Sequence, residues 1–245
     1  MGRMKNFQEE IYGEKIADIY DAWYATIDPR MIHVLTRYAQ GGKALELGIG
    51  TGRVALPLQK CGIALFGIDA SPAMVAKLNA KAGGETIPVH MGSFTEIPFE
   101  EKFDVIYVVF NTIFALISQE EQTRCFQAVA DHLKPNGVFV VEAFVPDLGR
   151  FSGGQTVRAV ELESQGVRLD VSMLDIANQV ISSQHVSITE DGIKLIPVKI
   201  RYIWPAEMDL IARLAGMRLA KRWSGWDEAP FNSSSGKHIS IYELS

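Results

Sequence analysis

A glycine-rich stretch runs Glu46-Leu47-Gly48-Ile49-Gly50-Thr51-Gly52 and follows directly on an apolar run that begins at Ala44. Glycines at alternate positions let the backbone turn tightly and let a ligand lie against the main chain without a Cβ in the way. A helical pattern begins near Arg53, and the N–H groups at its start point toward such a ligand. The stretch therefore predicts a strand, a ligand-binding loop and a helix, in that order.

The same alternation continues on the C-terminal side of the loop. Helical patterns begin after Ser71 and after Ser118, which forms a possible capping box with Glu121. Further strands are predicted at Ile63–Ile68, Thr86–His90, Phe103–Phe110, Val138–Phe144, Met217–Trp223 and His238–Leu244. Strands that alternate with helices favour a parallel sheet with helices on both faces. We expect an α/β, doubly wound sheet of seven strands whose last strand returns antiparallel.

Two segments lie outside this alternation. Residues 1–40 read as two helices, the second starting at Asp28-Pro29. Residues 151–204 have no helical period but alternate apolar and polar residues, with a hairpin turn at Glu190-Asp191-Gly192. Pro197 suggests an edge strand or a bulge there. The chain is thus predicted to hold a core (41–150 and 205–245), an N-terminal helical segment and an antiparallel β insert of three or four strands.

Composition limits the classes of function. The 245 residues are 47% hydrophobic and 22% charged, as expected of a soluble globular protein. The net charge of −5 and the absence of a Lys/Arg run argue against nucleic acid and membrane partners. Two cysteines, Cys61 and Cys125, and no apolar leader favour a reduced, cytoplasmic protein. The sequence shows no metal-ligand spacing, so no metal is expected.

The glycine loop is compatible with two classes of ligand, a dinucleotide and a cationic ligand. A dinucleotide fingerprint needs G-x-G-x-x-G, yet the third glycine position, counted from Gly50, holds the bulky Arg53. The loop is also preceded by the acid Glu46, which helps a cationic ligand and does nothing for a pyrophosphate. Both features argue against a dinucleotide, and the Tyr-x-x-x-Lys pair of short-chain dehydrogenases is also absent. A nicotinamide-dependent oxidoreductase stays as the alternative function.

The acid-x-G-x-G-x-G pattern resembles motif I of the class I S-adenosylmethionine-dependent methyltransferases, which have a Rossmann-like fold. The resemblance implies that S-adenosylmethionine is the cofactor and that Asp69, ending the second strand, binds its ribose hydroxyls. It also implies that Phe110 and Asn111, after the fourth strand, lie near the methyl group. Lys134-Pro135-Asn136-Gly137 and the residues after it look like the family's fifth-strand motif. The cofactor-binding residues implied are Tyr24, Glu46, Gly48, Gly50, Gly52, Asp69, Ala70, Met74, Ser93, Phe94, Phe110 and Asn111.

The flanking segments resemble those of small-molecule methyltransferases, such as aminosugar and peptide N-methyltransferases of natural-product pathways. By this resemblance residues 1–40 form a helical lid, with Tyr20 or Tyr24 over the cofactor, and the insert roofs the acceptor site. No Asn/Asp-Pro-Pro-Tyr/Phe motif of base-modifying enzymes follows the fourth strand. We therefore expect in-line methyl transfer to O or N of a small molecule.

The catalytic residue is open at this stage. An amine acceptor needs only deprotonation, whereas an alcohol needs a general base. The candidates for the catalytic role are Tyr20, Asn111, Glu142 and His185, with His33 and His238 as further possible bases. A homodimer is possible. A cofactor-binding protein without catalytic activity, using the insert as an interaction surface, is the second alternative.

Overall fold

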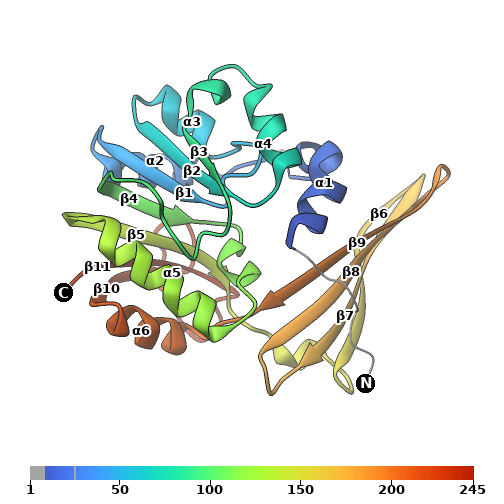
Figure 1. Cartoon of the computed structure of the whole chain (residues 1–245). Helices are drawn as coiled ribbons and strands as arrows, with labels where there is room; N and C mark the ends of the chain where they lie inside the picture. Colours follow the sequence, from blue (N-terminus) through green and yellow to red (C-terminus); the bar gives the residue numbers. More distant parts are fainter. Residues whose placement is uncertain (1–8, 25) are drawn as a thin grey trace.

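The computed structural model describes residues 9–24 and 26–245, so the first eight residues of the expected lid lie outside it. Its main body is a seven-stranded sheet in the order β10-β11-β5-β4-β1-β2-β3 (Figure 1). Strands β1 to β5 are parallel, and β11 is antiparallel to both its neighbours, which confirms the predicted sheet. The strands are β1 (Lys43–Leu47), β2 (Ala64–Asp69), β3 (Val89–Met91), β4 (Phe103–Val108), β5 (Leu133–Phe144), β10 (Met217–Trp223) and β11 (Lys237–Leu244).

Most helices begin where the sequence signals them. The Asp28 carboxylate accepts a hydrogen bond from the Arg30 N–H, and Ser118 and Glu121 form the predicted capping box. The helices are α1 (Glu9–Trp23), α2 (Pro29–Ala39), α3 (Ala55–Lys60), α4 (Pro72–Asn79), α5 (Gln119–His132) and α6 (Pro205–Leu214). Short 3-10 turns are η1 (Gly84–Thr86), η2 (Thr112–Ala115) and η3 (Leu148–Arg150).

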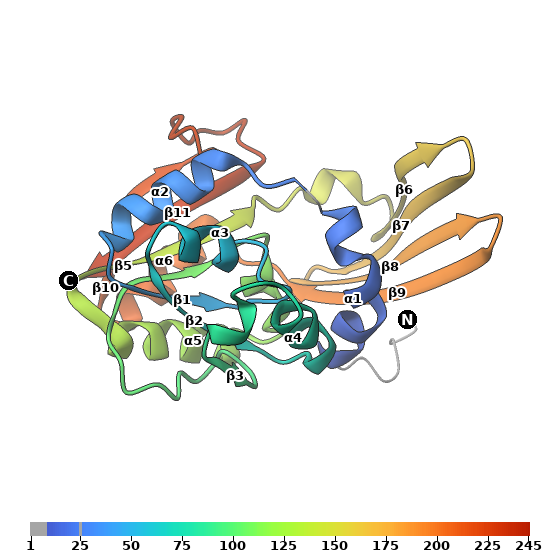
Figure 2. The same cartoon turned by 90° about the horizontal axis from the view of Figure 1, so that it is seen from above.

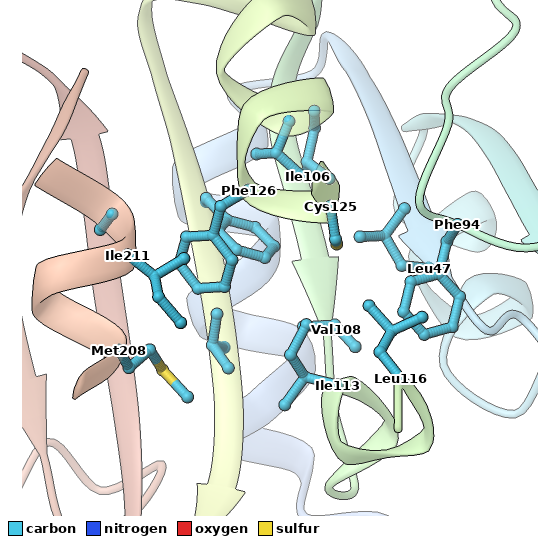
Figure 3. Close-up of a cluster of buried hydrophobic side chains, with 14 of the residues drawn as sticks. Leu47, Phe94, Ile106, Val108, Ile113, Leu116, Cys125, Phe126, Met208 and Ile211 are labelled. Carbon is cyan, nitrogen blue, oxygen red and sulfur yellow. The ribbon is translucent and has the colours of Figure 1, made fainter. Parts of the chain in front are cut away.

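The central strands are buried on both faces, which explains their continuous apolar sequence. Successive side chains point to opposite faces, so Val105 and Tyr107 of β4 pack with α2 and α3. Ile106 and Val108 pack on the other side, with Phe126 of α5 and the residues of α6 (Figure 3). Figure 2 shows α2 and α3 together on one side of the sheet.

Several predicted boundaries are wrong. Strand β5 begins at Leu133, five residues before its predicted start at Val138. The strand predicted at Thr86–His90 is instead the turn η1 followed by the short β3, and α3 begins at Ala55, after the glycine loop. The strand predicted at Phe103–Phe110 ends at Val108, because Phe110 and Asn111 have φ of 55° and 67°. Left-handed residues cannot continue a strand.

The insert forms a separate four-stranded antiparallel sheet in the order β6-β7-β8-β9, as predicted. Its strands are β6 (Gln155–Glu163), β7 (Gly166–Asp175), β8 (Val180–Thr189) and β9 (Gly192–Arg201). Pro197 lies in the edge strand β9, as expected, and the hairpin turn lies at Glu190-Asp191. The base of the insert joins the main core through Leu174 and Ile181. Among the residues described, no helix is both long enough and apolar enough to span a bilayer.

Candidate functional site

The glycine loop lies at the carboxyl edge of the parallel sheet, between β1 and α3. Gly48, Gly50 and Gly52 all have positive φ, at 74°, 54° and 75°. A Cβ on Gly48 would lie 2.4 Å from Thr112, and one on Gly52 would lie 2.3 Å from Leu78. A Cβ on Gly50 would lie 3.3 Å from the end of the Met74 side chain and 4.0 Å from the Gly48 carbonyl oxygen. Gly48 and Gly52 are thus required for packing, whereas Gly50 leaves room beside the backbone.

Asp69 stands at the end of β2, directly beside this loop. Its Oδ2 accepts a hydrogen bond from the Gly50 N–H at 2.7 Å, and its Oδ1 accepts one from the Ser71 N–H at 2.8 Å. Burial raises the pKa of Asp69, although these backbone N–H groups oppose the shift. A carboxylate has about four acceptor positions, so each oxygen keeps capacity for a further donor, such as a sugar hydroxyl.

Glu46 is buried beneath the loop, with 3% of its surface exposed. Its Oε2 accepts a hydrogen bond from the Tyr107 hydroxyl at 2.9 Å. Burial raises the pKa of Glu46 to about 8, against the lowering effects of Tyr107 and of the Arg53 charge. A positive charge placed beside Glu46 favours its ionised form, so the site suits a cationic ligand.

The raised pKa of Glu46 predicts a pH-dependent stability. Between pH 4.5 and about 8 the folded state holds a proton that the unfolded state has lost. The free energy of unfolding should therefore fall as pH rises through this window, by at most about 1.4 kcal/mol per pH unit. Glu46→Gln keeps an acceptor for Tyr107 and cannot titrate, so its denaturation profile should decline less. Urea denaturation at several pH values measures this, and parallel profiles for both proteins would refute the assignment.

Arg53, which departs from the dinucleotide fingerprint, lies in a cluster of aromatic rings. Its guanidinium carbon is 3.8 Å from the ring centroid of Phe110, and 5.6 and 5.7 Å from those of Tyr20 and Tyr24. Its Nη1 donates to the Tyr24 carbonyl at 2.7 Å. Tyr20 lies in α1 and Tyr24 directly after it, and Phe110 lies in the turn after β4, so this cluster joins the helical segment to the sheet. No sequence pattern predicts it, because the two tyrosines, Arg53 and Phe110 lie in three distant segments of the chain.

Helix α1 is fastened to the glycine loop and to α4 by polar contacts. The Thr51 hydroxyl donates to Asp21 at 2.6 Å, and Lys81 lies 2.6 Å from the same carboxylate. Lys77 of α4 pairs with Asp18 at 2.7 Å. One side of α1 therefore faces the loop.

The ends of β4 and β5 form another part of this edge. The two oxygens of Glu142 accept hydrogen bonds from Trp226, Lys237 and the Phe110 N–H, at 3.0–3.1 Å. Asn111 accepts one from the Phe144 N–H at 2.7 Å. These bonds hold Phe110 and Asn111 in their left-handed conformations, which are otherwise costly for residues with a Cβ. Glu142 and Asn111 therefore have structural partners, and their catalytic roles stay predictions.

The remaining residues expected to contact the cofactor differ in how exposed they are. Ala70 is half-buried beside Asp69, and Met74 is buried beside Gly50, between the loop and α1. Ser93 is exposed, and its hydroxyl accepts a bond from the Thr95 N–H at 3.3 Å. Phe94 is 8% exposed and belongs to the core beside Leu47 (Figure 3), so little of its ring is open to a ligand.

The insert presents a polar patch on the face that meets α1. Asp170, His185 and Ile196 are direct neighbours across β7, β8 and β9, so their side chains share one face of the sheet. Ile196 packs on α1, and His185 Nδ1 lies 3.4 Å from an Asp170 oxygen. Arg168, two residues before Asp170, lies over the Trp23 ring at 4.3 Å. We call this side of the insert its inner face.

The other histidines lie elsewhere. His238 is fully buried in β11, and burial lowers its pKa to about 4. His33 is exposed on α2. Within residues 9–24 and 26–245, no group of three or more His, Cys, Asp or Glu side chains could hold a metal ion.

Comparisons with known proteins agree on one family. A family model described as a methyltransferase domain matches residues 44–137. The solved CcbJ methyltransferase from Streptomyces caelestis is 36% identical, with a TM-score of 0.91 over 98% of this chain and 100% of that one. The cypemycin N-terminal methyltransferase of a Streptomyces species is 25% identical over 95% of this chain and 97% of its own length. The dTDP-4-amino-2,3,4,6-tetradeoxy-D-glucose N,N-dimethyltransferase of Saccharopolyspora spinosa is 28% identical over 67% and 69%, respectively.

Proposed function

Since this chain belongs to the S-adenosylmethionine-dependent methyltransferases, we propose that it methylates a nitrogen atom of a small-molecule acceptor. One observation carries the proposal. The loop of three left-handed glycines lies between Asp69, which keeps acceptor capacity, and the buried acid Glu46. These two carboxylates, with a loop backbone that carries no side chain at Gly50, suit a cationic nucleoside.

The residues present fit S-adenosylmethionine. When bound, it supplies a methyl group on a positively charged sulfur. Asp69 would accept hydrogen bonds from the ribose hydroxyls, and the negative charge of Glu46 would stabilise the positively charged ammonium of the methionine part. The Gly50 backbone would lie against that part without a side chain between them. Aligning the reactants in a site closed to water is worth up to about 7–11 kcal/mol, so these residues need only bind and orient.

We expect Asp69→Ala to weaken the binding of S-adenosylhomocysteine by roughly ten- to a hundredfold, because charge-assisted bonds to the ribose are lost. The matched control is Asp104→Ala. Asp104 also accepts a backbone N–H, that of Lys43, but it lies at the opposite edge of the sheet. Isothermal titration calorimetry compares the two variants. An equal loss of binding affinity in both variants would mean that Asp69 affects binding only through folding.

The acceptor site is proposed to lie between the helical lid and the inner face of the insert. Helix α1 packs between α4 and β9, since Ile16 and Ala17 contact both Met74 and Ile196, and its Asp21 accepts a hydrogen bond from Thr51 of the glycine loop. The polar patch of Asp170 and His185 thus lies on the same face as the residues that α1 covers. A site at the carboxyl ends of parallel strands is open to water, and the lid and the insert are placed to close it.

Nitrogen is favoured as the acceptor atom by two of the relatives. One is named as an N-terminal methyltransferase and another as a sugar N,N-dimethyltransferase. In this chain the paired His185 and Asp170 could take the proton that an ammonium acceptor must lose. Burial alone would raise the pKa of Asp170, but the hydrogen bonds from His185 and Ser172 and the nearby positive charges together lower it, so Asp170 stays charged beside the imidazole.

Transfer of a labelled methyl group to a panel of acceptors tests this proposal. The panel should contain aminosugars and peptides with free amino termini, each beside the hydroxyl analogue of the same skeleton. We expect the label on nitrogen and none on the hydroxyl analogues. Transfer to hydroxyl groups alone would contradict N-methylation, and no transfer despite tight cofactor binding would favour a protein without catalytic activity. A cytoplasmic location and a homodimer also remain proposals.

A further inference from the structure

Arg168 lies on the inner face of the insert, where the insert meets α1. Its guanidinium carbon is 4.3 Å from the ring centroid of Trp23, and its Nη2 pairs with Glu161 at 2.8 Å. Its Nε and Nη1 atoms are shielded from solvent, yet neither has a hydrogen-bond partner among the residues that the structure describes. These two atoms carry most of the N–H groups of the guanidinium. Arg168 therefore keeps hydrogen-bond donors that this part of the chain does not use.

Unused donors on a shielded guanidinium are costly unless a ligand meets them. A guanidinium does not lose its proton in a protein, so its charge loses hydration here with only one carboxylate as compensation. Stacking on Trp23 uses the face of the guanidinium plane, whereas the N–H groups point outward within that plane. The Arg168 side chain is 16% exposed, so it is not sealed from the surroundings. An acceptor oxygen from outside the protein would satisfy it.

The side chains in line with Arg168 favour an anion. Glu161, Arg168, Ser187 and Lys194 are direct neighbours across the four strands of the insert, so they share the inner face. This row holds more positive than negative side chains. Carboxylates and phosphates have the oxygen geometry that arginine N–H groups match. The unused donors of Arg168 therefore suit one of these two groups.

Arg168 also lies close to the pair of Asp170 and His185. Arg168 is opposite Ser187, and Asp170 is opposite His185, so Arg168 and His185 are diagonal neighbours on one face. Such neighbours lie about 7–8 Å apart. Figure 2 shows α1 between the main sheet and the insert, on the side where these residues lie. A small molecule several bonds long can thus contact Arg168 at one end and have its nitrogen atom beside His185.

We propose that Arg168 binds an anionic group of the acceptor, a carboxylate or a phosphate, and thereby selects acidic amines over neutral ones. The proposal rests on the proposed function, because it names a chemical class for the acceptor of that same site. The anionic oxygens accept hydrogen bonds from Nε or Nη1 of Arg168, and Trp23 holds the plane of the guanidinium. Arg168 then acts as a binding residue that sets specificity, while His185 lies beside the nitrogen.

Calorimetric binding of small amines to the full chain, saturated with S-adenosylhomocysteine, tests the proposal. The probes are ε-aminocaproate beside its amide, and aminopropyl phosphate beside aminopropanol, so each acid has a neutral counterpart and the two anionic groups are compared separately. We expect wild type to bind at least one acid about tenfold or more tightly than its counterpart, which is about 1.4 kcal/mol. Arg168→Gln should lose this preference, because it keeps a polar side chain but removes the charge.

The matched control is Arg218→Gln. It also removes an arginine that pairs with a carboxylate, that of Glu243, but from β10 of the main sheet. It should keep the wild-type preference for the acid. Binding of S-adenosylhomocysteine is measured first in each protein and should be within a few-fold of wild type, which shows that the variants are folded.

Three results would overturn the proposal. They are a wild type without preference for either acid, a preference that survives in Arg168→Gln, and a loss of S-adenosylhomocysteine binding in Arg168→Gln, which would assign Arg168 a structural role. Transfer of a labelled methyl group to the bound probes is measured separately. A probe that binds through Arg168 but receives no label would contradict N-methylation while supporting the anion site, so the two proposals fail in different ways.

Discussion

Replacing Gly50 with valine is expected to abolish binding of S-adenosylhomocysteine while leaving the protein folded. Gly50 has φ of 54°, and a Cβ there would lie 3.3 Å from the flexible end of Met74 and 4.0 Å from the Gly48 carbonyl oxygen, an ordinary contact. The protein can therefore accommodate the side chain at a backbone cost of about 1–3 kcal/mol. A ligand that lies against the Gly50 backbone cannot, because the valine methyl groups would occupy its place. We expect the dissociation constant to rise more than a hundredfold.

The control for backbone strain is Gly62→Val. Gly62 also has positive φ, 83°, and a Cβ there has nothing within 4 Å. It lies in the turn before β2, away from the cofactor edge, so the same strain should leave binding unchanged. Circular dichroism verifies folding and calorimetry measures binding. Normal binding by Gly50→Val would mean that the loop does not touch the ligand and that its likeness to motif I is accidental.

His185→Ala is expected to lower kcat with the amine acceptor by about a hundredfold, the lower range for loss of a proton acceptor. His185 lies on the inner face beside Asp170, whose carboxylate orients and stabilises a protonated imidazole. Binding of S-adenosylhomocysteine should not change, since the glycine loop and Asp69 lie on other elements. The histidine is half-buried in the sheet, so its removal should cost little stability.

The pH profile separates proton transfer from a structural effect. In wild type, kcat should rise with pH on the acidic side, and this rise should disappear in His185→Ala. His33→Ala, which removes an exposed histidine of α2, should keep the wild-type profile. A His185→Ala enzyme with an unchanged profile and a higher KM would show that His185 only helps to bind the acceptor.

The regular elements were predictable because their residues repeat with the period of a helix or a strand. The apolar run of β4 and the caps at Asp28 and Ser118 are local signals, and the structure has them where the sequence places them. The end of β4 was not predictable. Phe110 adopts a left-handed conformation through contacts with Glu142, which follows it by thirty-two residues. No local pattern records such a constraint.

The site was predictable in part for the same reason. Glu46 and the three glycines lie together in the sequence, and Asp69 ends the next strand. The cluster of Arg53 with the rings of Tyr20, Tyr24 and Phe110 joins three distant segments, so only the fold reveals it. Alternation also identified the insert strands, but it gives two faces without saying which is covered. The structure places the polar face toward α1 and leaves the apolar face exposed.

Isothermal titration calorimetry of the wild-type chain with S-adenosylhomocysteine, and separately with NAD and NADP, tests the identity of the cofactor most directly. The glycine loop, Asp69 and the buried Glu46 predict saturable one-to-one binding of S-adenosylhomocysteine and no measurable heat of binding with either dinucleotide. Asp69→Ala in the same titrations should weaken the binding of S-adenosylhomocysteine. Binding of NAD or NADP without S-adenosylhomocysteine would contradict the account and favour a nicotinamide-dependent oxidoreductase.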